Sequence, residues 1–261
     1  MNVRPAAVAG SFYPAEPSRL AAEVRAHLSS AEPPLGRRPK GLVAPHAGYV
    51  YSGPVAGSAF RQLEPWRGAI ERVVLLGPSH FVSFSGLALS PADAFRTPLG
   101  DVAVEAGAAE RLAGLPWVVI ADPPHAREHA LEVELPFLQI ALDRFELVPL
   151  VVGEASPEEV AEVLERLWGG AETLVVVSTD LSHYHDYATA AARDRKTADA
   201  IVELDVEGIG ESAACGRNPL RGLLLAARRR ALEAAELDLR SSGDTAGGRD
   251  RVVGYGAFAI G

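Results

Sequence analysis

The stretch LVVVSTDLSHYHD, residues 174–186, decides the fold class of this chain. Four apolar and mostly β-branched residues, Leu174 to Val177, end abruptly in a run of hydroxyl, carboxyl and imidazole side chains. A continuous apolar run that ends in polar residues is typical of a strand buried on both faces, as in a parallel sheet. In open α/β sheets, ligands bind just beyond the carboxyl ends of such strands. The stretch therefore predicts an α/β sheet with a site at its edge.

Two other strand-like runs end in the same way. In LVAPHAGY, His46 follows Leu42 to Pro45, and in VVLLGPSH, His80 follows Val73 to Ser79. Together with His183 of the first stretch, these histidines should meet at one edge of one sheet. Neutral imidazole is the commonest metal ligand among side chains. A lone histidine at a strand end is more often structural, but three at successive strand ends favour a metal or proton-transfer site.

Strand-like and helix-like segments alternate along the chain. We predict strands over residues 41–45, 72–76, 86–90, 101–104, 117–121, 146–152, 173–178, 236–241 and 251–259. We predict helices over residues 17–28, 54–63, 105–113, 157–168, 187–204 and 219–233, and a further helix around Leu131 to Leu142 that Pro136 should kink. Such alternation predicts a single-domain α/β/α sandwich over residues 1–261, with a mostly parallel central sheet.

Composition excludes several classes of protein. The formal net charge of −9 argues against a nucleic-acid groove, which needs a clustered basic surface. The single cysteine, Cys215, excludes an internal disulfide and any multi-cysteine zinc site. No basic-then-apolar leader opens the chain, and the longest apolar runs are far shorter than the roughly 20 residues of a membrane helix. We therefore expect a soluble, cytoplasmic protein that binds neither nucleic acid nor membrane.

Seven segments spread over nearly the whole chain resemble the Memo family. They are VAGSFYP, APHAGYVYSG, LGPSH, EHALEVELPFLQ, STDLSHY, CGRNP and the closing SSGDTAG…GYGAFAI. Bacterial members of this family are also called AmmeMemoRadiSam system protein B. The family is similar in fold to the class III extradiol ring-cleaving dioxygenases, the LigB-like enzymes, so the resemblance implies a LigB-like dioxygenase fold. Those enzymes hold Fe(II) with two histidines and a glutamate, and use further histidines as acid and base.

The resemblance implies a metal site in this chain. His46 of APHAGY and His80 of GPSH are the implied ligands. The third ligand of the animal family members is a cysteine that we align, through the segment SSxC, with Asp244 of Ser241-Ser242-Gly243-Asp244. Two histidines and a carboxylate are typical of non-haem Fe(II) centres, and the absence of a thiolate weakens a copper hypothesis. We therefore expect Fe(II), with Zn or Cu as alternatives.

Other residues have implied roles around this site. His183 of STDLSHY matches the catalytic histidine of the dioxygenases, and His129 of EHALE is a looser match to a second acid/base histidine. Both titrate near neutral pH when unperturbed. Glu132 would orient His129, or lie on the surface as the commoner outcome. We interpret Cys215 as a buried structural thiol, and His125 and His185 as solvent-facing loop residues.

Three functions are consistent with these residues. The first is a non-haem Fe(II) oxidoreductase of unknown substrate. The second is a non-catalytic or accessory role, in which the same cleft binds a small molecule, a peptide, a metal, or the AMMECR1-like and radical-SAM proteins that the family name implies. The third is a hydrolase with a zinc-activated water. Fold alone does not decide between them, because function depends on the site. The sequence does not determine the oligomeric state.

Overall fold

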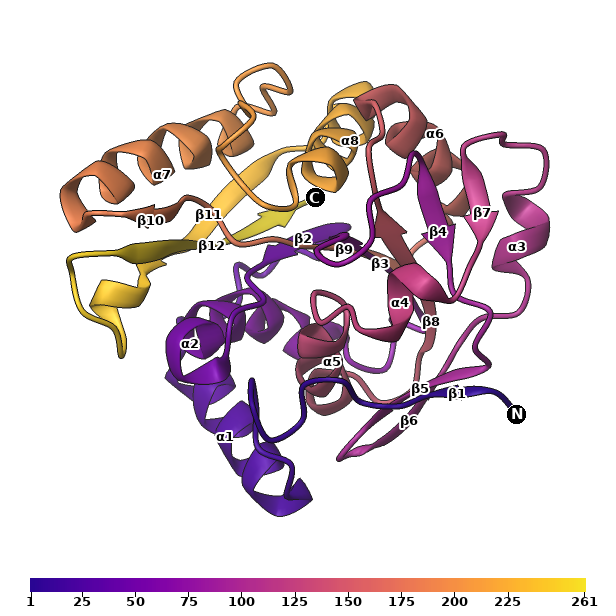
Figure 1. The fold of residues 1–261 in the computed structure, drawn as a ribbon, viewed down its shortest axis with the longest axis horizontal. Coiled ribbons are helices and arrows are strands. Elements are labelled where there is room, and N and C mark those ends of the chain that lie inside the picture. Colours follow the sequence, from indigo (N-terminus) through magenta and orange to yellow (C-terminus); the bar gives the residue numbers. More distant parts are fainter.

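Four parallel strands form the centre of the sheet in this computed structural model, which describes residues 1–261 (Figure 1). They are β2 (Gly41–Ala44), β9 (Thr173–Ser178), β3 (Arg72–Pro78) and β8 (Glu146–Val152), adjacent in that order. Alternate side chains along a strand point to opposite faces of a sheet. Val73 and Leu75 accordingly belong to one hydrophobic core, and Val74 and Leu76 to the other. The apolar runs of the sequence are continuous because both faces are covered.

Antiparallel strands extend the sheet on both sides. Next to β2 lies β12 (Val252–Ile260), which also pairs with β11 (Ala234–Ser241) and β10 (His183–His185). Next to β8 lies β4 (Leu87–Leu89), which pairs in parallel with β7 (Val118–Ile120). A separate small sheet contains β1 (Val3–Arg4), β5 (Ala94–Thr97) and β6 (Gly100–Ala103). The first strand ties the N-terminal arm to the body of the protein.

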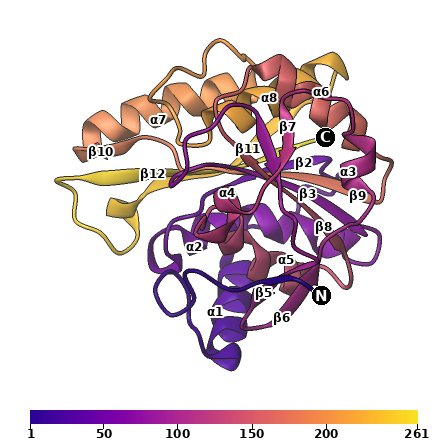
Figure 2. The ribbon, with the colours of Figure 1, turned by 45° about the vertical axis from the view of Figure 1, so that its right-hand side comes forward.

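Helices cover both faces of the central sheet (Figure 2). One core includes residues of α1 (Pro17–Ser30), α2 (Tyr49–Phe60) and α5 (Leu135–Ala141). The other includes residues of α3 (Ala108–Arg111), α6 (Pro157–Leu167), α7 (Tyr187–Val202) and α8 (Arg217–Arg229). Short helical turns are α4 (Pro123–Ala126), η1 (Arg61–Trp66), η2 (Glu132–Glu134) and η3 (Ser242–Asp244). The predicted α/β/α architecture with a mostly parallel centre is confirmed. No helix of the chain has the length and apolar character required to cross a bilayer.

Several predicted elements differ in detail. Pro136 does not kink a long helix: a 3-10 turn precedes it, and Pro136 lies in the first turn of α5, where its missing N–H has no helical partner to lose. The predicted helix over 105–113 is the single turn α3. The strand β10 was not predicted, because its three residues carry two imidazoles and no apolar alternation.

Candidate metal centre

Three ligand-type side chains meet at the carboxyl edge of the central sheet. His46 follows β2, His80 follows β3, and Cys215 lies in the loop just before α8. A ligand atom of each, taken from the imidazoles and the thiol, lies within 4.8 Å of the other two. The prediction that successive strand ends bring His46 and His80 together is therefore consistent with the geometry, and Cys215 joins them from a distant loop.

The loop of Cys215 is held against the end of β9. The backbone N–H of Cys215 donates to the carbonyl of Asp180 at 3.1 Å, and the N–H of Gly216 donates to Thr179 Oγ1 at 2.8 Å. A Cβ on Gly216 would lie 2.6 Å from Thr179 Cβ, so only glycine allows this close approach. The thiol accepts from the N–H of Asp180, with 3.2 Å between Sγ and N. These contacts position Sγ of Cys215 beside His46.

His46 is buried and neutral. Its backbone N–H donates to Oδ1 of Asp180 at 2.9 Å, and Nδ1 of its ring lies 2.8 Å from Oγ of Ser178. Burial, reinforced by the neighbouring His80, lowers the pKa of His46 to about 3. Its Nε2 lies 3.3 Å from Sγ of Cys215. An imidazole with one nitrogen hydrogen-bonded and the other facing a thiol is ready to act as a metal ligand.

Glu128 holds His80 in place. Its carboxylate accepts from the backbone N–H of His80 at 2.6 Å and contacts Nδ1 of the same residue at 2.8 Å. The N–H groups of His129 and Ala130 donate to the same carboxylate. Burial opposes ionisation of Glu128, but these hydrogen bonds and the electrostatic interaction with the neighbouring His80 outweigh it and lower the pKa of Glu128 to about 2. With Nδ1 engaged, Nε2 of His80 is the nitrogen left for a metal.

The two predicted acid/base histidines border the same cavity. The ring of His129 stacks on that of His80 with 4.6 Å between centroids, and its pKa is lowered to about 4 by burial and by His46. Nδ1 of His183 lies 2.8 Å from the carbonyl oxygen of Leu181. The cavity measures about 510 Å³. It is lined by Phe12, His46, Ala47, Gly48, His80, His129, Asp180, His183, Tyr184, Cys215 and Val253.

Asp244 does not join this group. Its Oδ2 accepts from the N–H and the hydroxyl of Ser241 at 2.9 and 3.0 Å, and its Oδ1 accepts from the hydroxyl of Tyr187 at 2.6 Å. It lines a different, small cavity of about 150 Å³ with Asp194. The carboxylate thus caps its own turn, η3, and the geometry gives no support to Asp244 as the third ligand. The third ligand-type side chain beside His46 and His80 is Cys215.

Two further interpretations need correction, and a third gains a new observation. The sulfur of Cys215, which we interpreted as a buried structural thiol, faces His46. Glu132 is fully buried and does not orient His129: it forms an ion pair with Arg4 and accepts from Tyr13 and from backbone N–H groups of the N-terminal arm. His125 is also buried rather than solvent-facing, with its Nε2 2.9 Å from the carbonyl of Ala88.

The thiol of Cys215 is protonated in the metal-free protein. Burial, together with the nearby Asp180, raises its pKa to about 12. A metal ion would replace this proton, since the thiolate is the form that binds metals. Two imidazoles and a thiol form a donor set suited to first-row transition metals, and the buried hydrogen-bond partners of His46 and His80 provide the outer support that such sites require. The residues present therefore fit a metal ion.

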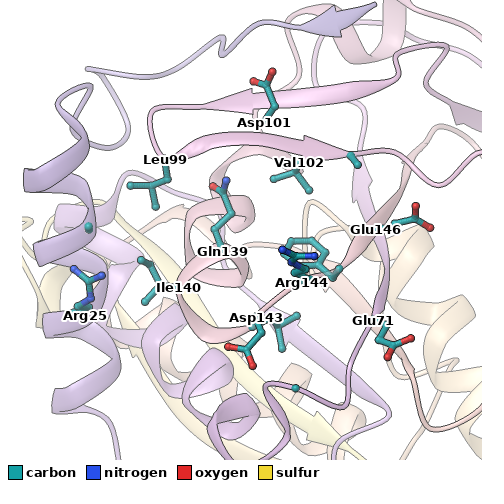
Figure 3. A pocket seen from close by; sticks show the side chains of 15 residues that line it. Arg25, Glu71, Leu99, Asp101, Val102, Gln139, Ile140, Asp143, Arg144 and Glu146 are labelled. Atoms are coloured by element: carbon teal, nitrogen blue, oxygen red, sulfur yellow. The ribbon is translucent and has the colours of Figure 1, made fainter. Parts of the chain in front are cut away.

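A larger cavity than that of the candidate metal centre lies elsewhere (Figure 3). It measures about 1070 Å³, and its lining includes Glu71 and Glu146, which lie where β3 and β8 begin. It is therefore at the amino ends of the strands, away from His46 and His80 at their carboxyl ends. Its lining contains no histidine or cysteine. This cavity therefore lacks the imidazole and thiol groups that make up the candidate metal centre.

Comparison with known proteins agrees with the resemblance seen in the sequence. A family model described as Memo-like protein matches residues 4–259. A MEMO1 family protein of Ignicoccus hospitalis is 36% identical, with 98% of each chain covered. Those of Methanothermobacter thermautotrophicus and Methanosarcina barkeri are each 35% identical, covering 97% and 99% of this chain and 98% and 100% of the relatives. The family model and these relatives match nearly the whole chain, and the chain belongs to the Memo family.

Proposed function

We propose that this protein binds a transition-metal ion through His46, His80 and Cys215 and acts as an oxidoreductase on a small molecule in the adjoining cavity. One observation carries the proposal: three donor atoms from segments far apart in sequence converge within 4.8 Å. Each ligand is also held by its own partner, respectively Ser178, Glu128 and the Asp180 N–H. Support of this kind around each ligand is characteristic of metal sites.

The donor set bears on the choice of metal. Imidazole suits iron, copper and zinc, whereas a thiolate adds affinity for softer ions such as Cu(I). The case against copper depended on Asp244 as the third ligand, and the thiol of Cys215 removes that basis. We propose a redox-active ion, iron or copper, with zinc as the alternative. When bound, such an ion supplies Lewis acidity and electron transfer.

The chain's own residues provide proton transfer beside the ligands. Nδ1 of His183 faces the carbonyl oxygen of Leu181, which accepts hydrogen bonds only, so Nδ1 carries the proton and Nε2 is basic. His129 lines the same cavity, and the low pKa of its imidazole keeps it neutral at pH 7. His183 is therefore the general base of the proposal, and His129 is a second candidate for proton transfer. Phe12, which contacts the ring of His129, helps to keep water from this wall.

A second candidate function rests on exposed aromatic rings near the cavity. Tyr184 is 64% exposed and Phe81 is 51% exposed. The guanidinium of Arg251 lies 5.1 Å from the ring centroid of Tyr184, and that of Arg127 lies 5.1 Å from that of Phe81. Exposed aromatic residues with arginine are enriched at protein interfaces. The alternative is an accessory protein that binds a peptide or an AMMECR1-like or radical-SAM partner there.

One experiment separates the two functions. Protein purified without oxygen is loaded with Fe(II) or Cu(I), and oxygen uptake is recorded with a panel of catechols and other small reductants. The oxidoreductase proposal expects uptake that falls on the order of 10²–10⁴-fold in His183→Ala, the usual range for general acid–base catalysis, while the metal stays bound. His80→Ala, which removes a proposed ligand, should lose both the bound metal and the oxygen uptake. Flat traces for metal-loaded wild type with every compound would favour the accessory role.

A further inference from the structure

Three polar groups converge on one buried hydroxyl beneath the candidate metal centre. Oγ of Ser178, at the end of β9, lies 2.7 Å from the carbonyl oxygen of Ala130, 2.7 Å from Oε1 of Glu134 and 2.8 Å from Nδ1 of His46. Ser178 and Glu134 are both fully buried, at 0% exposure. Because the hydroxyl and the carboxyl group are shielded from solvent, the hydrogen atoms in these three contacts must come from Ser178, Glu134 and His46.

The carbonyl of Ala130 determines where those hydrogen atoms lie. A backbone carbonyl accepts and never donates, whereas a serine hydroxyl has one hydrogen to donate and two lone pairs to accept with. If Ser178 donates to Ala130, both other contacts must be donated to Ser178. His46 then carries its hydrogen on Nδ1, and Glu134 carries one on Oε1. All three contacts are satisfied only with this assignment.

The surroundings of Glu134 support the same assignment independently. No cation pairs with it, and its Oε2 has no hydrogen-bond partner. An ionised carboxylate in such a place would be very costly, because burying a charge requires a partner. Burial, assisted by the charge of Asp180, raises the pKa of Glu134 well above its ordinary value.

Glu132 provides the contrast within the same turn. It is as fully buried as Glu134, yet it pairs with the guanidinium of Arg4 and accepts from the hydroxyl of Tyr13. The backbone N–H groups of Ala7 and Val8 donate to it as well. Two carboxyl groups two residues apart thus have opposite environments: one is surrounded by donors and a cation, and the other has a single hydroxyl.

We propose that Glu134 is a neutral carboxylic acid that donates to Ser178, and that Ser178 thereby holds His46 with its hydrogen on Nδ1 and a bare Nε2 toward Cys215. The proposal deepens the proposed function, because a bare Nε2 is what a metal ligand requires. Ser178 and Glu134 are positioning residues, since they act only through His46. The hydrogen bonds from Glu134 to Ser178 and from His46 to Ser178 orient the ring of His46 without placing a negative charge beside it. Glu128, in contrast, supports His80 with an ionised carboxylate.

The protonation of Glu134 can be measured directly. Infrared spectra of the protein with ¹³C-labelled glutamate should contain a protonated carboxylic acid band at pH 7 that is absent in Glu134→Gln. The Glu134→Gln variant should remain folded, because the amide N–H replaces the acid O–H as donor to Ser178. If wild type has no such band, or if Glu134→Gln leaves it unchanged, Glu134 is not the neutral acid and the proposal is overturned.

The tautomer of His46 provides the second readout. Nitrogen NMR of ¹⁵N-histidine-labelled, metal-free protein should show His46 protonated at Nδ1 in wild type and in Glu134→Gln, and a mixture of tautomers in Ser178→Ala. Affinity for Zn²⁺, measured by competition with a chelator, should fall about 10–100-fold in Ser178→Ala and stay near wild type in Glu134→Gln.

A wild-type His46 protonated at Nε2 would overturn the inference. If Ser178→Ala does not fold, the infrared and NMR spectra of wild type and Glu134→Gln still test the protonation of Glu134 and the tautomer of His46. Both spectroscopic tests use metal-free protein, so a correct tautomer without metal binding would refute the proposed function and leave this inference standing.

Discussion

Sγ of Cys215 lies 3.3 Å from Nε2 of His46, although 169 positions separate the two residues. In the metal-free protein this is a contact between a thiol and a neutral imidazole, since the pKa of Cys215 is raised to about 12 by burial and that of His46 is lowered to about 3 by burial. Neither group is charged at pH 7. The pair therefore costs little to bury, and it becomes a ligand pair only when a metal displaces the thiol hydrogen.

This relationship predicts that metal binding releases a proton. Because the thiol is protonated well above pH 7 while His46 is not protonated until about pH 3, Cys215 should lose its proton and His46 should lose none when an ion binds between pH 6 and 8. Affinity should then rise about tenfold per pH unit in that range, as linkage requires for one displaced proton. Chelator competition with Zn²⁺ at several pH values measures the slope. Cys215→Ala should bind weakly and with almost no slope, and a flat wild-type profile would contradict the prediction.

Much of the fold and part of the site were predictable from sequence. The apolar runs before His46, His80 and His183 predicted central strands correctly, because a strand covered on both faces is apolar throughout. All three histidines border one cavity, as expected from strand ends that share an edge. Local pattern is sufficient where the ligand directly follows its strand.

The third member of the group was not predictable in the same way. Cys215 follows no strand, and its place depends on a loop that bonds to Thr179 and Asp180 through the backbone. The signal that was available is the CGRNP segment, which places the only cysteine of the chain at the start of a helix. Asp244 was favoured because four residues resembled a family segment, but a short loop match does not specify where a side chain points.

The buried ion pair of Arg4 and Glu132 should be important for stability. Arg4→Met would leave the fully buried Glu132 carboxylate without its cation, and breaking a buried pair in this way costs about 3–5 kcal/mol. Urea unfolding at pH 7 measures the loss. Arg37→Met is the matched control, because its ion pair with Glu233 is exposed and such pairs contribute about 0–1 kcal/mol. Equal losses in both variants would show that the N-terminal arm is not held by Arg4.

Mild acid should destabilise the protein through His125. Burial lowers the pKa of His125 to about 4, whereas the unfolded chain keeps the ordinary value of 6.5. Between these two values the unfolded state binds more protons, so the free energy of unfolding falls as the pH drops from 6.5 to 4. His125 should lower the free energy of unfolding by at most about 1.4 kcal/mol for each unit of difference between its folded and unfolded pKa.

The test compares His125→Gln, whose amide can still donate to the Ala88 carbonyl, with wild type in urea unfolding at several pH values. The variant should lose less stability between pH 6.5 and 4. Identical slopes for the two proteins would indicate that His125 is already protonated in the folded state or that other groups determine the acid sensitivity.

The most direct test of the account is the metal stoichiometry and affinity of wild type, Cys215→Ser and Asp244→Asn, measured side by side. Each protein is stripped of metal, titrated without oxygen with Fe(II) and separately with Cu(I), and assayed for bound ion after gel filtration. The account predicts one ion per chain for wild type and Asp244→Asn with similar affinity. It predicts a loss of at least tenfold in affinity for Cys215→Ser, because removal of a ligand should cost no less than the roughly 10–100-fold that removal of an outer hydrogen-bond partner costs. Full occupancy of Cys215→Ser together with loss of metal from Asp244→Asn would contradict it.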